Sequence, residues 1–434
     1  MRTIFLLDID CFFASVEMAL QPELHGKPLC VGGHRAERGI VVCPNYEARA
    51  YGVRTAMPLR TAEQLLPPDA VFLPGNHYLY GEYSERVMNI LYDFTPDIEQ
   101  VSVDEAYLDV TGCLHLWVSP DEAGAGRTTA PFRMAAAIKA RIRHECGLSV
   151  SIGIASNKVC AKIAACLRKP DGTVMVPCGH EKEFLAPLPI EVVPGVGKKT
   201  LPKLHARGIF TIADVLTQKL GPNSWIGRYL TTIASGNDER VMAYDRVEKS
   251  ISRDTTFGRD MNNLTLITSM LYYLTERCCK TLRERHQCAS TLTVKVRFAD
   301  FTTVQKQTTL RLATANEEDI FTVARHMLTD LLPRQYLIRL VGVKVSHLTA
   351  SDRAGSQGVL DIAVSEKLST LHNRLDALQA KYGYGSIRWG ITYALREPLG
   401  ADEERYRPQW FPRQHRETRS HPDVVRTAGP VYVP

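Results

Sequence analysis

The chain has 434 residues, of which 44% are hydrophobic and 8% aromatic, and its formal net charge is +6. This composition suffices for about three domains with real cores and excludes a wholly disordered chain. No apolar run of the roughly 18 residues that a membrane span needs is present, and Asp8 and Asp10 interrupt the apolar N-terminal stretch, unlike in a secretory signal. Eleven cysteines without a C-x-x-C pair predict reduced thiols in a cytoplasmic protein.

The positive charge is concentrated in one part of the sequence. Residues 246–350 contain 16 Lys and Arg against 10 Asp and Glu, a net charge of +6, so that the rest of the chain is neutral. Such asymmetry is typical of a module that binds nucleic acid. A solvated face with a few surplus arginines remains an equal alternative.

The first 170 or so residues predict alternating strands and helices. The main elements are a strand at 2–9, a helix at 77–92, strands at 98–103 and 106–110 around a tight turn, a helix at 131–146, a strand at 149–155 and a helix at 157–167. Residues 11–76 carry shorter elements, at 28–32, 39–43, 45–52 and 60–66. If they are an insertion, the remaining order is β-α-β-β-α-β, the ferredoxin-like arrangement.

Three acids converge in this arrangement. The first strand lies antiparallel to the third, which brings Asp8, at the end of one, beside Glu105, at the start of the other, with Asp104 in the adjoining turn. Converging carboxylates raise each other's pKa unless a cation lies between them. Oxygen ligands without His or Cys suit Mg²⁺, and two such ions support in-line phosphoryl transfer. The sequence therefore predicts a two-magnesium site, with an acidic turn that binds nothing as the alternative.

Residues 180–243 are expected to form a separate small unit with a helix-hairpin-helix pattern. Gly195 and Gly197 permit a tight turn whose N–H groups face a phosphate at a helix N-terminus, and Lys198 follows them. This motif contacts nucleic-acid backbone without reading sequence. A P-loop is excluded by Val192 and a dinucleotide fingerprint by Thr200, each of which stands where a glycine is required. An ordinary helix-turn-helix corner remains the alternative.

Residues 246–350 predict a small α+β domain, with extended stretches at 291–298, 308–312 and 339–348 and helices at 264–285 and 317–332. In the first of these stretches hydroxyl and basic residues occupy every second position, which places them on one face of the strand and suits phosphate binding. A plain exposed edge is the alternative. They are Thr291, Thr293, Lys295 and Arg297.

The residues that follow predict one amphipathic helix and then little fixed structure. Leucines recur at spacings of three and four, which favours a helix packed on the body of the protein. They are Leu368, Leu371, Leu375 and Leu378. From Pro398 onward proline and charge dominate.

Several motifs, in order, carry a resemblance to a known family. They are DIDCFFASVE at 8–17, NYEAR at 45–49, SVDEAYLD at 102–109, SIGIASNK at 151–158, KPDG at 169–172 and PGVG at 194–197. With them, roughly residues 1–350 resemble the Y-family translesion DNA polymerases, most closely the bacterial DNA polymerase IV type. Cys43-Pro44 and Asp171 depart from the pairs that are usual in this family.

The resemblance implies an α+β right-hand polymerase with a ferredoxin-like palm, small fingers, a helix-hairpin-helix thumb and an α+β little-finger domain. The expected boundaries are 1–10 with 77–178 for the palm, 11–76 for the fingers, 179–243 for the thumb, 246–350 for the little finger and 351–434 for a partly disordered C-terminal extension.

The resemblance also implies residue roles. Asp8, Asp104 and Glu105 match the catalytic metal ligands for two Mg²⁺ ions, together with the Ile9 carbonyl, and Phe13 matches the steric gate against the ribose 2′-hydroxyl. The residues that match triphosphate contacts are Tyr46, Arg49 and Lys169. A guanidinium fork and an ammonium suit developing phosphate charge.

The implied function is low-fidelity, template-directed DNA synthesis without proofreading, by a monomer acting on primer-template DNA and dNTPs. A catalytically silent DNA-binding repair scaffold is the alternative, and the surviving acid triad disfavours it. The segment Gln357–Ile362 loosely resembles the peptides by which bacterial polymerases dock on a sliding clamp, with a plain linker as the alternative.

Overall fold

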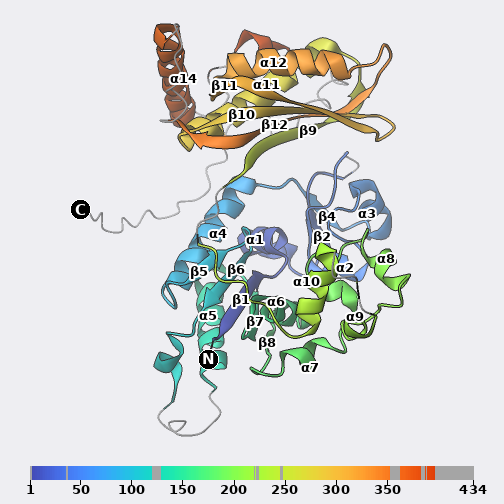
Figure 1. Ribbon diagram of the computed structural model, residues 1–434, viewed down its shortest axis with the longest axis vertical. Coiled ribbons are helices and arrows are strands. Elements are labelled where there is room, and N and C mark those ends of the chain that lie inside the picture. Colours follow the sequence, from blue (N-terminus) through green and yellow to red (C-terminus); the bar gives the residue numbers. More distant parts are fainter. Residues whose placement is uncertain are drawn as a thin grey trace, which may run out of the picture. The chain divides into compact units, whose positions relative to one another are not determined.

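The computed structural model folds into two compact units, Met1–Arg246 and Val247–Pro434 (Figure 1). It describes residues 2–395 apart from 36–37, 120–128, 219, 221–223, 245–247, 352–361, 383–386 and 388. The division falls where the sequence predicts the start of the little-finger domain.

The first unit is built on a five-stranded sheet with the order β5-β6-β1-β7-β8. Its strands are β1 (Ile4–Ile9), β5 (Ile98–Gln100), β6 (Glu105–Asp109), β7 (Val150–Ala155) and β8 (Thr173–Met175). Strand β1 lies antiparallel between β6 and β7, which confirms the ferredoxin-like prediction. Strand β8 pairs parallel to β7 and was not predicted.

Both faces of this sheet are buried. Alternate residues of β1 pack on one face with α4 (His77–Tyr92) and α5 (Ala130–Cys146). The other residues of β1 pack with α6 (Lys158–Leu167) and with the short helices of residues 181–234 in one core cluster. The helices of residues 181–234 therefore share a core cluster with this face of the sheet, and their assignment to a separate thumb domain stays a prediction. These helices are α7 (Glu181–Leu185), η4 (Ile190–Val192), α8 (Leu201–His205), α9 (Asp214–Thr217) and α10 (Trp225–Ala234).

The insertion between β1 and α4 has a small core of its own, separate from the cluster beneath the main sheet. A three-stranded sheet with the order β3-β2-β4 organises it. Its elements are α1 (Phe12–Leu20), η1 (Pro22–Leu24), β2 (Leu29–Val31), β3 (Cys43–Pro44), α2 (Tyr46–Ala50), α3 (Leu59–Leu65) and β4 (Val71–Leu73). After the main hairpin, η2 (Leu114–Trp117) precedes α5.

The second unit repeats the order β-α-β-β-α-β. Its elements are β9 (Ser250–Met261), α11 (Leu264–Glu284), β10 (Gln287–Phe298), β11 (Thr303–Thr314), α12 (Glu317–Leu331) and β12 (Ile338–Ala350). The sheet is antiparallel with the order β11-β10-β12-β9, and α11 and α12 cover one face (Figure 1). The sequence predicts this α+β class but misses β9.

A C-terminal helix, α14 (Ile362–Tyr382), docks on α11 through polar groups, and the short η5 (Gly390–Leu395) follows it. Arg283 of α11 donates to both carboxylate oxygens of Asp376, at 2.7 and 3.1 Å, and to Glu317 at 2.8 Å. His372 and Gln379 are buried, whereas Leu371 and Leu378 are 43% and 40% exposed. The prediction that the leucine row packs inward is therefore wrong for these two residues.

Other predictions for the C-terminal extension lie outside the described residues, namely the clamp-like peptide at 357–361 and everything after residue 395. Within the described residues no helix is long and apolar enough to cross a membrane. All eleven cysteines are free thiols, as the sequence predicts.

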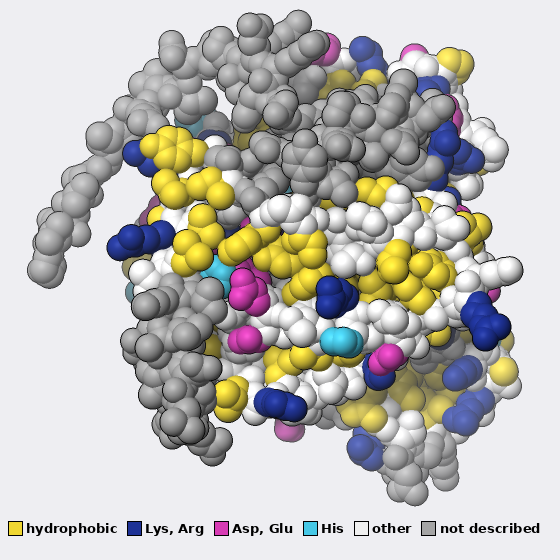
Figure 2. Space-filling model, turned by 90° about the horizontal axis from the view of Figure 1, so that it is seen from above, with side chains coloured by type: hydrophobic (Ala, Val, Ile, Leu, Met, Phe, Trp, Pro, Cys, Tyr) yellow, Lys and Arg dark blue, Asp and Glu magenta, His cyan; other side chains and the backbone are white. Residues whose placement is uncertain are grey.

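Viewed from above, the surface carries single Lys and Arg side chains interspersed with hydrophobic ones (Figure 2). Leu264 at the start of α11 and Ile391 in η5 are 49% and 37% exposed. The two residues line one pocket of the second unit and are therefore not isolated on the surface.

Close approach of α6 to β7 depends on a glycine. A Cβ atom on Gly153 would lie 1.9 Å from the Ala161 carbonyl oxygen and 2.5 Å from the Ala165 nitrogen, both backbone atoms of α6. We expect Gly153→Ala to lower the free energy of unfolding by about 1–3 kcal/mol or more, measured by urea denaturation.

Gly81→Ala is the matched control, because Gly81 lies in α4 and a Cβ atom there would have no atom of the described residues within 4 Å. It should raise stability by about 0.5–1 kcal/mol through helix propensity. Equal stability of the two variants would contradict the packing argument.

Candidate active site

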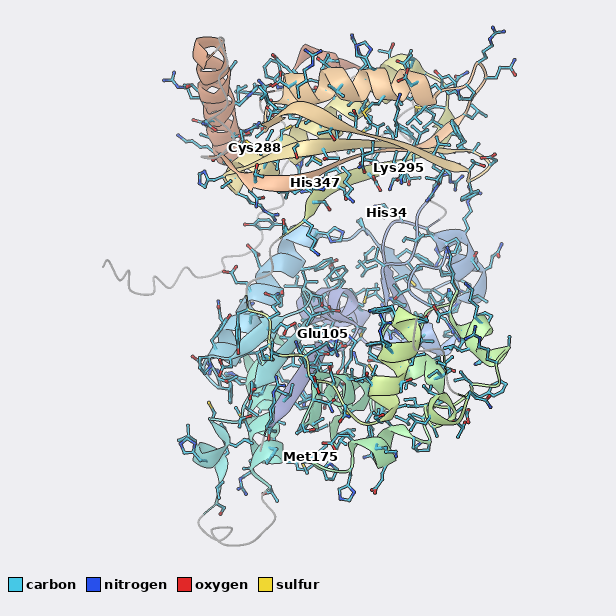
Figure 3. The ribbon with its side chains drawn as sticks, in the orientation of Figure 1. His34, Glu105, Met175, Cys288, Lys295 and His347 are labelled. Carbon is cyan, nitrogen blue, oxygen red and sulfur yellow. The ribbon has the colours of Figure 1, made fainter. Side chains whose placement is uncertain are left out.

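The sheet register places the predicted acids together at one edge of the first unit. Asp8 of β1 is directly opposite Glu105 of β6, and the Ile9 N–H donates to the Asp104 carbonyl oxygen at 2.9 Å. Figure 3 labels Glu105 among the side chains of this unit. Paired positions in an antiparallel sheet project their side chains on the same face. The predicted convergence of the Asp8 and Glu105 positions is therefore confirmed.

Each of these two carboxylates contacts a lysine. Lys169 Nζ donates to Asp8 Oδ1, and Lys162 Nζ lies 2.5 Å from both carboxylate oxygens of Glu105. The side chains of Asp8 and Glu105 are 18% and 12% exposed. The lysine ammonium groups thus supply positive charge next to both acids. Asp104 instead accepts a hydrogen bond from the Ser102 hydroxyl at 2.5 Å.

The electrostatics leave a surplus of negative charge at Asp8. Burial raises the pKa of Asp8 above its ordinary value of 3.8, and the neighbouring Asp104 and Glu105 raise the pKa further, while Lys169 opposes them. The ion pair with Lys169 therefore does not fully compensate burial and repulsion. A further cation would stabilise the ionised form.

The donor set fits a hard divalent cation in chemistry, since it consists of oxygen atoms alone. Within the part of the chain that the structure describes, no three His, Cys, Asp or Glu side chains are grouped closely enough to hold a metal ion as they stand. Asp8 and Glu105 each contact a lysine ammonium group instead.

Tyr46 and Arg49 lie on α2, three residues apart and on one face of the helix. The Arg49 guanidinium lies 5.2 Å from the centre of the Tyr46 ring, and its Nε donates to the Pro44 carbonyl at 3.0 Å. Buried Asn45 caps the helix by accepting from the Ala48 N–H at 2.9 Å. The cap fixes the residue at which α2 starts, and therefore the positions of Tyr46 and Arg49 along the helix.

Lys169 is the third predicted triphosphate contact, and it precedes a loop held by ion pairs. Asp171 contacts Arg143 at 2.7 Å and Lys139 at 3.1 Å. Burial alone would raise the pKa of Asp171, but the hydrogen bonds from Arg143 and Lys139 outweigh it and lower the pKa. The aspartate that departs from the family's usual residue thus has basic partners in this chain.

Phe13 lies at the start of α1, after Cys11, whose backbone is left-handed with φ of 35°. Its ring is half-buried and stacks on Tyr80 with centroids 4.2 Å apart and an angle of 15°. Tyr80 is buried and donates to Glu17 Oε1 at 2.6 Å. Phe12 is only 3% exposed and belongs to the core. The prediction that the two adjacent rings point apart is wrong, because their centroids are 5.4 Å apart and the Phe12 ring also lies edge-on to Tyr80, at 6.3 Å.

The expected helix-hairpin-helix turn lies between η4 and α8. Gly195 has φ of 95°, a left-handed conformation that favours glycine. The Tyr229 hydroxyl of α10 donates to the Pro194 carbonyl at 2.8 Å and anchors the turn. Gly197 and Lys198 follow it, just before α8. Their role in binding a phosphate stays a prediction.

In the second unit, the predicted polar strand is β10, an interior strand, so the alternative of a plain exposed edge is wrong. Thr291 and Thr293 are buried and bond His347 at 2.9 Å and Gln307 at 3.4 Å. Lys295 pairs with Asp254, and Arg297 donates to Thr303 at 2.9 Å. Lys295 and His347 lie on the side of the sheet away from α12 (Figure 3). The hydroxyls are thus used within the sheet, and cations share this face with an acid.

Sequence reasoning missed the residues whose role depends on tertiary contact. Lys158 and Lys162 are one turn apart on α6 and contact Glu99 and Glu105. Their spacing of four was a usable signal of a shared face. Asp10 belongs to the first quoted motif but received no role. Its contacts come from segments far apart in sequence, which no local pattern reveals.

Three family models match the chain. They are the impB/mucB/samB family at residues 7–166, its C-terminal domain at 248–360 and the IMS family HHH motif at 179–209. A protein called DNA polymerase IV from Dehalococcoides mccartyi strain CBDB1 is 42% identical over 91% of this chain and 99% of its own. Another DNA polymerase IV, from Desulfatibacillum aliphaticivorans, is 37% identical over 88% and 94%.

The chain belongs to the Y-family of DNA polymerases. It is a DNA-directed DNA polymerase for translesion synthesis, as the motifs predicted, and the silent scaffold is not favoured. A divalent metal cofactor is general in this family.

Solved structures agree with this assignment. A Y-family DNA polymerase chimera, Dbh-Dpo4(243-245)-Dbh, is 27% identical with a TM-score of 0.71, covering 80% of this chain and 99% of its own. DinB from Sulfolobus solfataricus is 28% identical with a TM-score of 0.53, covering 79% and 98%. The predicted polymerase fold is therefore confirmed.

Proposed function

We propose that this polymerase joins a dNTP to a primer 3′-hydroxyl at the sheet edge formed by Asp8, Asp104 and Glu105. The register of Asp8 against Glu105 is the observation that supports it, because it sets two acids side by side at the end of a buried strand. Asp8, Asp104, Glu105 and the Ile9 carbonyl would hold two Mg²⁺ ions. When bound, these ions would activate the hydroxyl and neutralise charge on the leaving pyrophosphate.

The chain's own residues would orient the triphosphate. Arg49 offers a fork of donors and Lys169 a compact ammonium, both suited to phosphate oxygens. Lys169 contacts Asp8 in this structure and would exchange that carboxylate for phosphate when a nucleotide binds. Tyr46 adds a hydroxyl from the same helix as Arg49. The metal ions and Lys169 would then together neutralise the negative charge of the acids and of the triphosphate.

Removal of the Asp8 charge should separate chemistry from binding and folding. We expect Asp8→Asn to lower the rate of primer extension by about 10²–10³-fold or more, while the Kd for primer-template DNA changes little. Because the folded-state pKa of Asp8 is raised, its contribution to stability is present below pH 3.8 and lost as the pH rises through the raised pKa. The variant should therefore be no less stable than wild type at pH 7.

Glu105→Gln is the companion variant and should lose extension in the same way, with DNA binding measured by fluorescence anisotropy. Near-normal extension by either variant would overturn the two-metal assignment.

Phe13 is proposed as the gate that excludes ribonucleotides, supported on one face by the buried ring of Tyr80. A hydrophobic pocket alone discriminates only weakly against an added hydroxyl, whereas a rigid ring against C2′ adds steric overlap. We expect Phe13→Ala to reduce the dNTP-to-rNTP ratio of kcat/KM strongly, to the level of about 100-fold or less that a pocket without steric overlap provides, with a modest loss for dNTPs.

Phe12→Ala is the companion variant, since its ring belongs to the core but lies 5.4 Å from the Phe13 ring and 6.3 Å from the Tyr80 ring, so it tests whether packing beside Phe13 alone affects the sugar ratio. It should cost about 3–5 kcal/mol of stability and leave the sugar ratio unchanged. A sugar ratio in Phe13→Ala equal to that of wild type would refute the gate.

The helix-free face of the second unit is proposed to contact primer-template DNA, with the turn at Gly195, Gly197 and Lys198 as a further backbone contact. Lys295, Arg297 and Lys344 share this face, because Thr293 is directly opposite Lys344 and alternate residues of β10 face the same side. Each phosphate that the protein neutralises adds about 0.7–0.9 to the salt slope of binding.

We expect Arg297→Ala with Lys344→Ala to reduce the slope of log K against log salt by about 1.4–1.8 if each contacts one phosphate. Arg325→Ala is the control, because this exposed side chain lies on α12, on the other side of the sheet. A slope that responds equally to both changes would exclude a localised DNA surface.

We also propose three further properties of this chain. The segment Gln357–Ile362 would dock on a sliding clamp. The chain would act as a monomer. The eleven free thiols support a reducing, cytoplasmic location.

A further inference from the structure

Asp10 is a fully buried carboxylate to which the mechanism assigns no task. Its side chain accepts four hydrogen bonds, two at each oxygen. Oδ1 accepts from the Ser151 hydroxyl at 2.8 Å and the Tyr46 hydroxyl at 3.4 Å. Oδ2 accepts from the Asp171 N–H at 2.8 Å and the Ser149 hydroxyl at 3.1 Å. An ionised carboxylate has about four such acceptor positions, so this one is fully used.

The four donors come from three segments of the first unit. Ser149 and Ser151 flank the first residue of β7, Tyr46 begins α2, and the Asp171 N–H lies two residues after Lys169. The first segment is part of the main sheet, the second belongs to the insertion, and the third follows α6. Two of the three carry a proposed triphosphate contact.

Asp10 is itself held rigidly by its main chain. Its N–H donates to the Ser149 carbonyl at 3.0 Å, and its own carbonyl accepts from the Ser15 hydroxyl at 2.6 Å. The carboxylate is therefore a fixed reference point at the end of β1. The groups that donate to it are held at that position, and loss of the carboxylate would leave the buried Ser151 hydroxyl without this acceptor.

We propose that Asp10 is a positioning residue that sets the placement of Tyr46 and of the Lys169 loop relative to each other. The inference rests on the proposed triphosphate role of Tyr46 and Lys169. Asp10 itself does not touch the nucleotide. It fixes the position of Tyr46 relative to Lys169, so that both side chains contact the same triphosphate.

A purely structural carboxylate would act differently. Its loss would lower stability and leave the affinity for nucleotide unchanged in the folded fraction. A misplaced triphosphate contact instead weakens nucleotide binding and therefore lowers kcat/KM, since displacement of about 1 Å can cost about 100-fold. The split between KM and kcat, measured beside stability, separates the two roles.

The test compares Asp10→Asn and Asp10→Ala in the full chain, with single-nucleotide incorporation at varied dNTP. Asn keeps one acceptor oxygen and can donate to hydroxyls, so it should raise KM severalfold. Ala should raise KM by about 10–100-fold. In both, kcat should change by less than about threefold. If Ala does not fold, Asn carries the test. A wild-type KM in every folded variant would overturn the proposal.

Thr95→Ala is the matched control. Thr95 is 1% exposed, donates to the Asp109 carbonyl at 2.7 Å and accepts from the Asp97 N–H at 3.2 Å, all away from the insertion and the Lys169 loop. It should lower the melting temperature without a change in KM. An equal rise of KM in Thr95→Ala would show that any buried hydrogen bond has this effect, and would overturn the proposal.

Coupling to Tyr46 completes the test. Tyr46→Phe and Asp10→Asn should each raise KM, and the double variant should raise it by less than the product of the two. If the rise of KM in the double variant equals the product of the two single rises, positioning through the Tyr46 hydroxyl would be excluded. If Tyr46→Phe and Lys169→Ala both leave KM unchanged, the triphosphate assignment fails. If they raise it and Asp10→Ala does not, positioning alone fails.

Discussion

The antiparallel register of β1 is the constraint on which the site depends. Strand β1 pairs on one side with β6, which sets Asp8 opposite Glu105, and on the other with β7, which sets Asp8 opposite Ser151. A slip of one residue would turn every side chain to the other face. Hydrophobic pattern alone cannot prevent this, because Ile4, Phe5, Leu6 and Leu7 are all fully buried. The two ladders and the polar anchors at the end of the strand must fix the register instead.

Asp8 and Asp10 are two residues apart, but their different surroundings suit them to different roles. Asp8 is partly exposed, contacts Lys169 and has a raised pKa, mainly through burial. Asp10 is fully buried among neutral donors. Alternation places both on the same side of β1, so depth and partners distinguish them. The charge of Asp8 is not fully compensated by Lys169, which suits metal binding. Asp10 has every acceptor position occupied, which suits a structural reference point.

Sequence predicts most elements whose pattern is local and strong. The helix His77–Tyr92 is found at the predicted residues, and strands β1 and β7 within one or two residues of the predicted bounds. Strand β9 was missed because buried and exposed residues do not alternate regularly along it, and β8 because it has only three residues. The acids were predictable because topology brings them together. The contacts of Lys162 and Asp10 were not, because they depend on packing of distant segments.

The two units use one order of elements for two different purposes. In the first, the initial strand is interior, so its end is flanked on both sides and its acids are gathered at a point. In the second, the initial strand is at the edge, and the helix-free face carries polar and charged side chains, with Leu340 opposite Arg297. Lys295 of β10 reaches Asp254 of β9 across β12, where Gly342 leaves room: a Cβ there would lie 1.8 Å from Asp254 Oδ1. A sheet face with charged side chains on neighbouring strands suits an extended partner, as an interior strand end suits a reacting centre.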